Sequence, residues 1–193
     1  MKPGFPFRPA ALALAAMLLA SGCQTPVKPP PRPPAPVGKP ARKESYWKDD
    51  GTPGTASIFV SLGEQRAYFY KGQKLVGEAN ISSGKKNFRT PAGDFKVIQK
   101  DRNHVSNLYG DFVDEAGEVV KSNVDTSKDP VPEGAVFRGA KMPYFLRFHG
   151  GYGMHAGRVP NYPASHGCVR LPRFMAEHFF SNAGAGTPVT IQD

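Results

Sequence analysis

Proline is distributed unevenly along this 193-residue chain, and its distribution limits what the N-terminal part can fold into. Nine of the 20 prolines fall between Pro26 and Pro53, in a stretch with no apolar periodicity. Proline removes a backbone donor and fixes φ, so such a stretch favours an extended polyproline conformation. At about 3.1 Å per residue, about 25 residues counted from Gln24 could reach at most roughly 75 Å. We therefore predict a flexible tether over residues 23–53 that adds nothing to a packed core.

The segment before the tether has the composition of an export signal. The first eight residues carry two cations and no acid, an apolar run covers Ala10–Ala20, and small residues precede Cys23. Because the run is too short to span a membrane, it indicates a signal peptide over residues 1–22. Small residues directly before a cysteine resemble a bacterial lipoprotein box, which implies that Cys23 is lipidated. The alternative is an ordinary signal peptide cut near Gly22, with Cys23 left free.

The residue after Cys23 bears on where the protein is sent. It is Gln24 rather than aspartate, which by the same resemblance implies sorting to the outer membrane. We therefore expect a periplasmic protein, lipid-anchored in the inner leaflet of that membrane. Loss of the first 22 residues removes two cations and no acid, so the net charge falls from +9 to +7. A basic exported protein can meet anionic lipid or wall polymer, whereas export disfavours nucleic acid as a partner.

The remaining residues, 54–193, carry the short alternating runs of a single β-rich domain. Runs bounded by turn residues predict strands at 55–62, 66–70, 74–82, 94–100, 145–148, 152–155 and 187–192. A helix is expected after Pro172, with an apolar face formed by Leu171, Phe174, Met175 and Phe179. The polar stretch 101–134 is expected to be an irregular surface excursion, and long loops often carry function. We predict a mainly β fold with one or two short helices, arranged as a sandwich.

Candidate chemistry is concentrated between residues 149 and 170. This segment holds three of the five histidines and the only cysteine beyond Cys23. A single cysteine near histidines is a candidate thiol nucleophile, and the thiol needs a base or a positive field to react. Cys168 is therefore the candidate nucleophile, with His155 or His166 as its base.

Two neighbours of the cysteine fit the same chemistry. Gly167 would let backbone N–H groups approach a reacting carbonyl, as an oxyanion hole requires. Arg170 would share a strand face with the cysteine and could lower the thiol pKa or bind a substrate carboxylate. Two alternatives remain open at this point. The first is a structural cysteine in a Gly-rich hairpin, and the second is a zinc ion held by some of His149, His155, His166 and Cys168.

The hexamer Ser165-His166-Gly167-Cys168-Val169-Arg170 resembles the signature of the YkuD-type L,D-transpeptidases. The tetrapeptide GMHA at 153–156 resembles the catalytic-histidine strand of that family. Three further segments match in order, namely ISSG at 81–84, TPAGDF at 90–95 and GTPVTI at 186–191. The resemblance thus extends over nearly all of residues 55–193.

This resemblance implies a YkuD-like β-sandwich catalytic domain that transfers acyl groups without a cofactor or a metal. Cys168 would attack a peptidoglycan tetrapeptide stem at the carbonyl of its third residue, release D-Ala and form a thioester that an amine resolves. His155 would be the general acid and base. The oxyanion and substrate-binding residues would be Ser165, His166, Gly167 and Arg170. Residues 90–93 would shape the neighbouring loop.

Several assignments stay open in the sequence. Water in place of the amine would give an L,D-carboxypeptidase or an amidase, and a non-catalytic wall-binding lipoprotein is a further alternative. We expect a monomer. The histidines without a motif match are expected to be structural, namely His104, His149 and His178. The tyrosines near the motif are expected to pack in the core or in loops, namely Tyr144, Tyr152 and Tyr162.

Overall fold

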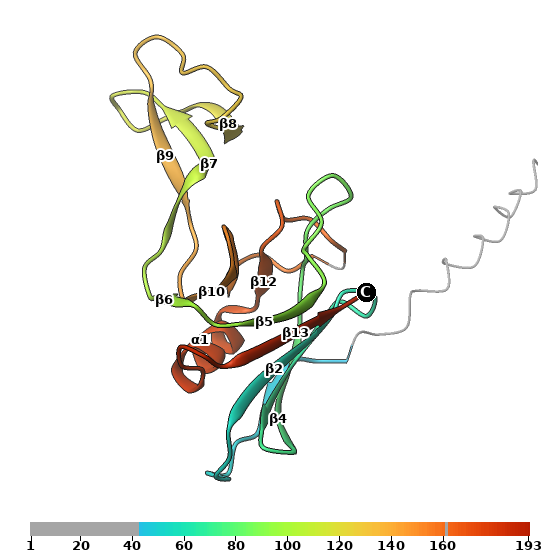
Figure 1. Ribbon diagram of the computed structural model, residues 1–193. Coiled ribbons are helices and arrows are strands. Elements are labelled where there is room, and N and C mark those ends of the chain that lie inside the picture. The colour runs from blue at the N-terminus through green and yellow to red at the C-terminus, as the bar shows by residue number, and fades with distance from the viewer. Residues whose placement is uncertain (1–42, 161) are drawn as a thin grey trace, which may run out of the picture. The chain divides into compact units, whose positions relative to one another are not determined.

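The computed structural model describes residues 43–160 and 162–193 (Figure 1). The predicted signal peptide, Cys23, Gln24 and the predicted tether up to residue 42 lie outside the described residues. The elements are β1 (Tyr46–Trp47), β2 (Ala56–Ser61), β3 (Arg66–Lys71), β4 (Lys74–Asn80), β5 (Gly93–Lys96), β6 (Gln99–Asp101), β7 (Val105–Val113), β8 (Val119–Asp125), β9 (Val136–Lys141), β10 (Phe145–His149), β11 (Tyr152–Ala156), β12 (Val169–Leu171), α1 (Arg173–Asn182) and β13 (Pro188–Gln192). The mainly β fold expected from the sequence is confirmed. Within the described ranges, no helix is long and apolar enough to cross a membrane.

A six-stranded sheet with the order β1-β4-β3-β2-β13-β5 forms the first layer. Strands β2, β3 and β4 form the antiparallel meander that alternating apolar residues and short turns predict. The C-terminal strand β13 then pairs in parallel with β2, where Val189 lies opposite Ile58. Both residues are buried in the core, and the last strand lies inside the sheet, between β2 and the edge strand β5.

A four-stranded sheet with the order β12-β11-β10-β6 forms the second layer, and α1 packs on β10 and β11. The two sheets and the helix enclose one apolar core, to which the helix contributes Met175, Ala176 and Phe179. Phe174, which the sequence placed on the apolar face of the helix, is instead 48% exposed. The helix starts one residue after Pro172, and its buried face is centred on Met175 and Phe179, one turn apart. We call these two sheets and α1 the body.

The expected strand 94–100 is two strands that belong to different sheets. The chain passes from β5 to β6 at Val97 and Ile98, whose N–H groups donate to Thr187 and Arg147 carbonyls respectively. Val97 is buried while Ile98 is 58% exposed. The change of sheet therefore happens inside a run whose alternation looks continuous.

The expectation of an irregular excursion over 101–134 is wrong. Most of it folds with residues 135–141 into a third sheet of order β8-β7-β9, which we call the flap (residues 105–141). Figure 1 shows the flap standing away from the six-stranded sheet. Its pairing contains register shifts near Gly110 and Phe112, and these interrupt the simple alternation by which strands are recognised. Phe112, Val113 and Val124 are its buried apolar residues.

Residues 43–53, which the proline pattern placed in the tether, also belong to the body. β1 pairs with β4, so that Tyr46 lies opposite Glu78, and the Lys48 N–H donates to the Val76 carbonyl at 2.7 Å. The Trp47 ring stacks on His178 at 4.8 Å between ring centroids. The packed unit therefore begins about ten residues earlier than the predicted boundary at residue 54, because one aromatic side chain gives this polar segment a place in the core.

Candidate active site

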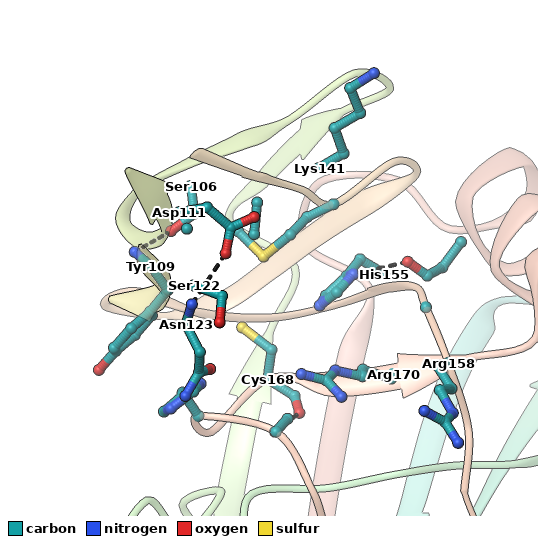
Figure 2. Close-up of a pocket in the computed structure, with 17 residues that line it drawn as sticks. Ser106, Tyr109, Asp111, Ser122, Asn123, Lys141, His155, Arg158, Cys168 and Arg170 are labelled. Atoms are coloured by element: carbon teal, nitrogen blue, oxygen red, sulfur yellow. Dashed lines mark hydrogen bonds between the residues drawn. The ribbon is translucent and has the colours of Figure 1, made fainter. Parts of the chain in front are cut away.

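The catalytic motif enters the site at the start of β12. Val169, the first residue of that strand, is buried in the core opposite Met154 of β11. Since neighbouring side chains on a strand point to opposite faces, Cys168 and Arg170 share the face that looks away from the core. The parallel pairing of β11 and β12 sets His155 opposite Arg170 on that same face. Figure 2 shows these side chains around one cavity.

Hydrogen bonds inside the turn before Cys168 fix its shape. The Ser165 hydroxyl donates to the Cys168 carbonyl at 2.5 Å and accepts from the Gly167 N–H at 3.0 Å. The Thr90 hydroxyl donates to the Gly167 carbonyl at 2.7 Å and accepts from the Gly84 N–H at 2.9 Å. Residue 90 therefore shapes this loop, as the sequence predicted. Ser165 and the Gly167 N–H were both expected at the oxyanion site. Ser165 is buried, and its hydroxyl and the Gly167 N–H are hydrogen-bonded within the turn.

Position 167 accepts no residue other than glycine. Its φ is +116°, a conformation that residues with a Cβ rarely adopt. A Cβ built there would lie 2.4 Å from the ring of Tyr152, far inside van der Waals contact. The glycine therefore lets the turn close over Tyr152, which is half-buried beneath it.

The Cys168 thiol is half-buried, and its sulfur lies 3.9 Å from the carbonyl oxygen of Gly151. Burial raises the pKa of the Cys168 thiol, although a hydrogen bond from the Gly153 N–H and the nearby Arg170 cation act in the opposite direction. The net effect favours the neutral thiol. The cysteine therefore needs a base in order to react.

His155 has the position and the protonation state of such a base. The side chain is buried, and burial lowers the pKa of His155 to about 4. Its Nδ1 lies 2.9 Å from the Ala156 carbonyl, which can only accept, so Nδ1 carries the proton and Nε2 keeps its lone pair. At neutral pH the imidazole is therefore uncharged and presents a free nitrogen.

His166, the second candidate base, is oriented toward the flap. Its ring stacks on Tyr109 of β7 at 4.5 Å between centroids and meets the Phe88 ring edge-on at 4.6 Å. The Lys85 ammonium lies 3.2 Å from its Nε2 and donates to it. Burial and the Lys85 charge lower the pKa of His166. With Nε2 occupied, His166 connects the catalytic turn to the flap, and His155 is the better candidate base.

A cavity of about 390 Å³ lies between the body and the flap. The body contributes His155, Arg158, Cys168 and Arg170 to its lining, and the flap contributes Tyr109, Asp111, Asn123 and Lys141. Figure 2 shows Asp111 and Asn123 above Cys168, joined by a hydrogen bond from the Asn123 N–H to the Asp111 carboxylate at 2.9 Å. Cys168 thus opens into a cavity whose size suits a small peptide segment.

Comparison with known families then identifies the fold and its motifs. The model of the L,D-transpeptidase catalytic domain, YkuD, matches residues 55–191, which is most of the chain. This chain belongs to the YkuD family. The match contains all the motif segments on which the sequence resemblance rested. A search of curated proteins finds no match.

Solved structures of L,D-transpeptidases share the YkuD fold. A cysteine-to-serine mutant of the Enterococcus faecium L,D-transpeptidase is 26% identical, with a TM-score of 0.54, and the match covers 72% of this chain and 50% of that one. The L,D-transpeptidase from Mycobacterium smegmatis is 20% identical, with a TM-score of 0.56 and coverages of 72% and 59%. An L,D-transpeptidase solved in complex with imipenem is 19% identical, with a TM-score of 0.55 and coverages of 72% and 59%. This chain thus spans between 50% and 59% of those proteins.

The remaining histidines and tyrosines lie outside the catalytic cavity of this YkuD domain. His104 stacks on Phe145 and His178 stacks on Trp47, which agrees with the expectation that they are structural. His149 is exposed at the end of β10, so its structural role stays a prediction. Tyr144 is buried, whereas Tyr162 is 60% exposed, so the expectation of packing fails for Tyr162. Within residues 43–160 and 162–193, no three His, Cys, Asp or Glu side chains are grouped as a metal site needs.

Sequence reasoning missed several cavity residues of the YkuD domain. Tyr109, Asp111 and Lys141 come from the flap, which the sequence did not identify as a folded sheet. Arg158 lies three residues after His155, beyond the end of β11, and no motif pointed to it. The flap residues that line the cavity can be predicted only when the pairing of the flap strands is known.

Proposed function

We propose that this protein is a cysteine-dependent L,D-transpeptidase that acts on peptidoglycan tetrapeptide stems in cell wall biogenesis. The observation that carries the proposal is the arrangement of Cys168 and His155. A neutral thiol, directly before β12, and a neutral imidazole with a free Nε2, on β11, line one cavity. The membership in the YkuD family and the names of its structural neighbours support the choice of substrate.

In the first step Cys168 attacks the carbonyl carbon of the third stem residue. His155 Nε2 takes the thiol proton as the S–C bond forms, which avoids the need for a preformed thiolate. The charged oxygen of the tetrahedral intermediate faces the turn 166–168 and the Arg170 cation. The intermediate collapses when the C–N bond breaks, and His155 returns the proton to the amine of the departing D-Ala. A thioester on Cys168 remains.

In the second step an acceptor amine attacks the thioester carbonyl. His155 Nε2 now takes a proton from the nitrogen, the new C–N bond forms, and the C–S bond breaks. The proton then passes to the Cys168 sulfur and restores the neutral pair. Water in place of the amine gives hydrolysis by the same sequence of bonds, so the acceptor decides between transfer and cleavage.

We also propose that the enzyme works from a lipid anchor. A lipid on Cys23, followed by a proline-rich tether, would hold the catalytic domain at a distance from the outer membrane, on its periplasmic side. Stable anchoring takes more than one buried acyl chain, at about 0.8 kcal/mol per CH₂. The Cys23→Ala variant should leave the membrane fraction or remain an uncleaved precursor. If the unaltered protein washes off membranes with salt alone, the anchor proposal is wrong.

The catalytic proposal is tested by the masses of the protein and its products. Incubation with purified tetrapeptide muropeptides should release D-Ala and yield either an acyl-enzyme mass or a cross-linked product. Imipenem should give a stable adduct, since a structural neighbour is named as a complex with that compound. The Cys168→Ala variant should form neither species. The His155→Ala variant should acylate about 10²- to 10⁴-fold more slowly, and the matched His149→Ala variant should resemble the unaltered protein.

Two results would contradict the proposal. An adduct on the Cys168→Ala variant would place the nucleophile elsewhere. Binding to muropeptides without any release of D-Ala would favour a non-catalytic wall-binding protein. Release of D-Ala with only hydrolysed products would instead make the enzyme an L,D-carboxypeptidase.

A further inference from the structure

Phe145 of β10 is fully buried, yet it does not belong to the apolar core of the body. The next residue, Leu146, does belong to that core and pairs with Met154 of β11. Because side chains alternate along a strand, Phe145 points to the opposite face of the second sheet, where His155 also lies. A large apolar ring is thus buried on the catalytic face of this sheet.

The Phe145 ring packs against His155 and across the backbone next to Cys168. The register of β10 on β11, continued by one residue, sets Phe145 opposite His155, and the two ring centroids are 6.2 Å apart. A Cβ built on Gly153 would lie 2.5 Å from ring atoms Cε2 and Cζ of Phe145. The ring therefore occupies the space that a side chain at position 153 would need, beside the N–H that bonds to the Cys168 sulfur.

A second ring contact of Phe145 comes from the segment after β6. The His104 ring stacks on the Phe145 ring at 4.2 Å between centroids, with 17° between the ring planes. Its Nδ1 lies 3.1 Å from the Asp101 carboxylate, and its carbonyl accepts from the Met142 N–H at 2.8 Å. The His104 side chain is 19% exposed. Phe145 therefore touches both a side chain that water reaches and the buried His155.

Burial determines the charge of His155. Loss of water is the largest influence on this imidazole and lowers the pKa of His155 to about 4. The charged or titratable side chains around it are Cys168 and Arg170 at β12, His104 after β6, Arg158 after β11, and Asp111 and Lys141 of the flap. Arg170 and His104 act in the same direction as burial, and the hydrogen bond to Ala156 opposes them. An imidazolium with so low a pKa returns its proton readily to a departing amine.

We propose that Phe145 is a positioning residue, which excludes water from His155 and so keeps its imidazole uncharged in acid where a solvated histidine would be protonated. The inference rests on the proposed function, since it takes His155 as the base. Phe145 touches no reacting atom, and every proton transfer stays with His155 Nε2, the thiol and the amines. Its effect comes from the apolar volume that it places beside the imidazole.

The test reduces this side chain in the full chain and follows the protonation of His155. The histidine resonances are titrated by NMR, which needs no turnover, and the rate of D-Ala release from a tetrapeptide muropeptide is measured over the same pH range. Phe145→Leu leaves a gap that admits water, so it should raise the midpoint of both curves from about 4 by about one pH unit or more. At neutral pH the imidazole is uncharged in both proteins, so their rates should differ much less than in acid.

Phe148→Leu, on the same strand, is the matched control. Phe148 is also buried, but it belongs to the core cluster, and its ring lies 5.5 Å from the Phe95 ring between centroids. This variant loses the same atoms and should destabilise the body to a similar degree without moving either midpoint. Phe145→Ala opens a larger gap and should shift both midpoints further. If Phe145→Ala does not fold, the two leucine variants still decide.

The outcomes separate the inference from the function on which it rests. Equal midpoints in Phe145→Leu and the unaltered protein overturn the inference. An equal shift in Phe148→Leu also overturns it, because a loosened core would then be the cause. A His155 that titrates near 6.5 in the unaltered protein leaves no burial effect, and the inference fails. If the NMR midpoint shifts as expected but no protein releases D-Ala, the proposed function fails while the effect of the ring on the imidazole stands.

Discussion

The body and the flap line the same cavity, but the body has a large apolar core and the flap has a small one. In the body, His155 and Cys168 are chain neighbours of Met154 and Val169, which are buried in a core formed by two sheets and a helix. The flap has a separate small cluster around Phe112, and several of its valines are half or more exposed. The proposed nucleophile and base are thus fixed by the large core, while the opposite wall is held by few apolar contacts. Segments of that kind open at lower free energy than a core does.

Removing one buried ring from each region should expose this difference most clearly. Phe69 of the body lies 5.2 Å from the Trp47 ring and 5.1 Å from the Phe179 ring, between centroids. Phe69→Ala should lower the free energy of global unfolding by about 3–5 kcal/mol, measured by urea denaturation. Phe112→Ala should instead open the flap locally, with faster hydrogen exchange over residues 105–141 and little change in the urea midpoint of the body. A global loss equal to that of Phe69→Ala would show that the two regions unfold as one unit.

Acid should affect the two regions in different pH windows. Burial lowers the pKa of His155 to about 4, against about 6.5 in an unfolded chain. The unfolded state then binds the extra proton between these values, so the body loses up to about 3 kcal/mol as the pH falls from 6.5 to 4. In the flap, hydrogen bonds lower the pKa of Asp125 and of Asp129, so their contribution persists until the pH falls below 3.8.

Urea denaturation at pH 7, 5.5 and 4.5 measures this slope. The His155→Gln variant should reduce the slope, and the residual slope reflects the lowered pKa of His166. The same protonation should give the acylation rate an acid limb with a midpoint near pH 4 rather than 6.5. A limb at 6.5 would mean that a solvated histidine is the base.

The sequence predicts a region well when its pattern lies in neighbouring residues, and poorly when it depends on long-range pairing. The motif hexamer predicts Cys168 as the nucleophile because the family's signature has those residues at adjacent positions, and that assignment stays a prediction. The meander follows from plain alternation and is confirmed. Thr90, predicted to shape a loop, bonds to the Gly167 carbonyl from 77 residues away. The flap could not be predicted, since its register shifts break the alternation and its cluster depends on long-range pairing.

The boundary of the proline-rich segment was predicted wrongly because its composition hides one residue that packs in the core. Its composition predicts a tether up to residue 53. Residues 43–53 nevertheless pack on the body, because Trp47 contacts the core. Trp47 packs on Phe69, Phe179 and His178, none of which is near it in sequence. A composition average over thirty residues cannot register one side chain that fits a core.

Truncation at this boundary should therefore weaken the body and spare the flap. A chain that begins at Gly54 loses the Trp47 ring and the Lys43 carbonyl, which accepts from Arg66 at 2.7 Å. We expect a loss of about 2 kcal/mol or more in unfolding free energy relative to a chain that begins at Lys43. The point variant Trp47→Ala should account for most of the loss. Equal stability of the two chains would return residues 43–53 to the tether.

The smallest effect should come from the contact that joins the two regions. The Tyr109 ring of the flap stacks on His166 of the catalytic turn at 4.5 Å, with 14° between the ring planes. Aromatic pairs contribute about 0.5–1.5 kcal/mol beyond their burial, so Tyr109→Ala should weaken flap closure by about threefold to tenfold. Because the chemistry is fixed by the body, this loss should raise the KM for muropeptides and leave kcat nearly unchanged. Tyr109→Phe keeps the ring and should restore KM, which separates stacking from any role of the hydroxyl. If Tyr109→Ala lowers kcat instead, the flap positions the reacting groups, and the division between a rigid body and a loosely held wall does not hold.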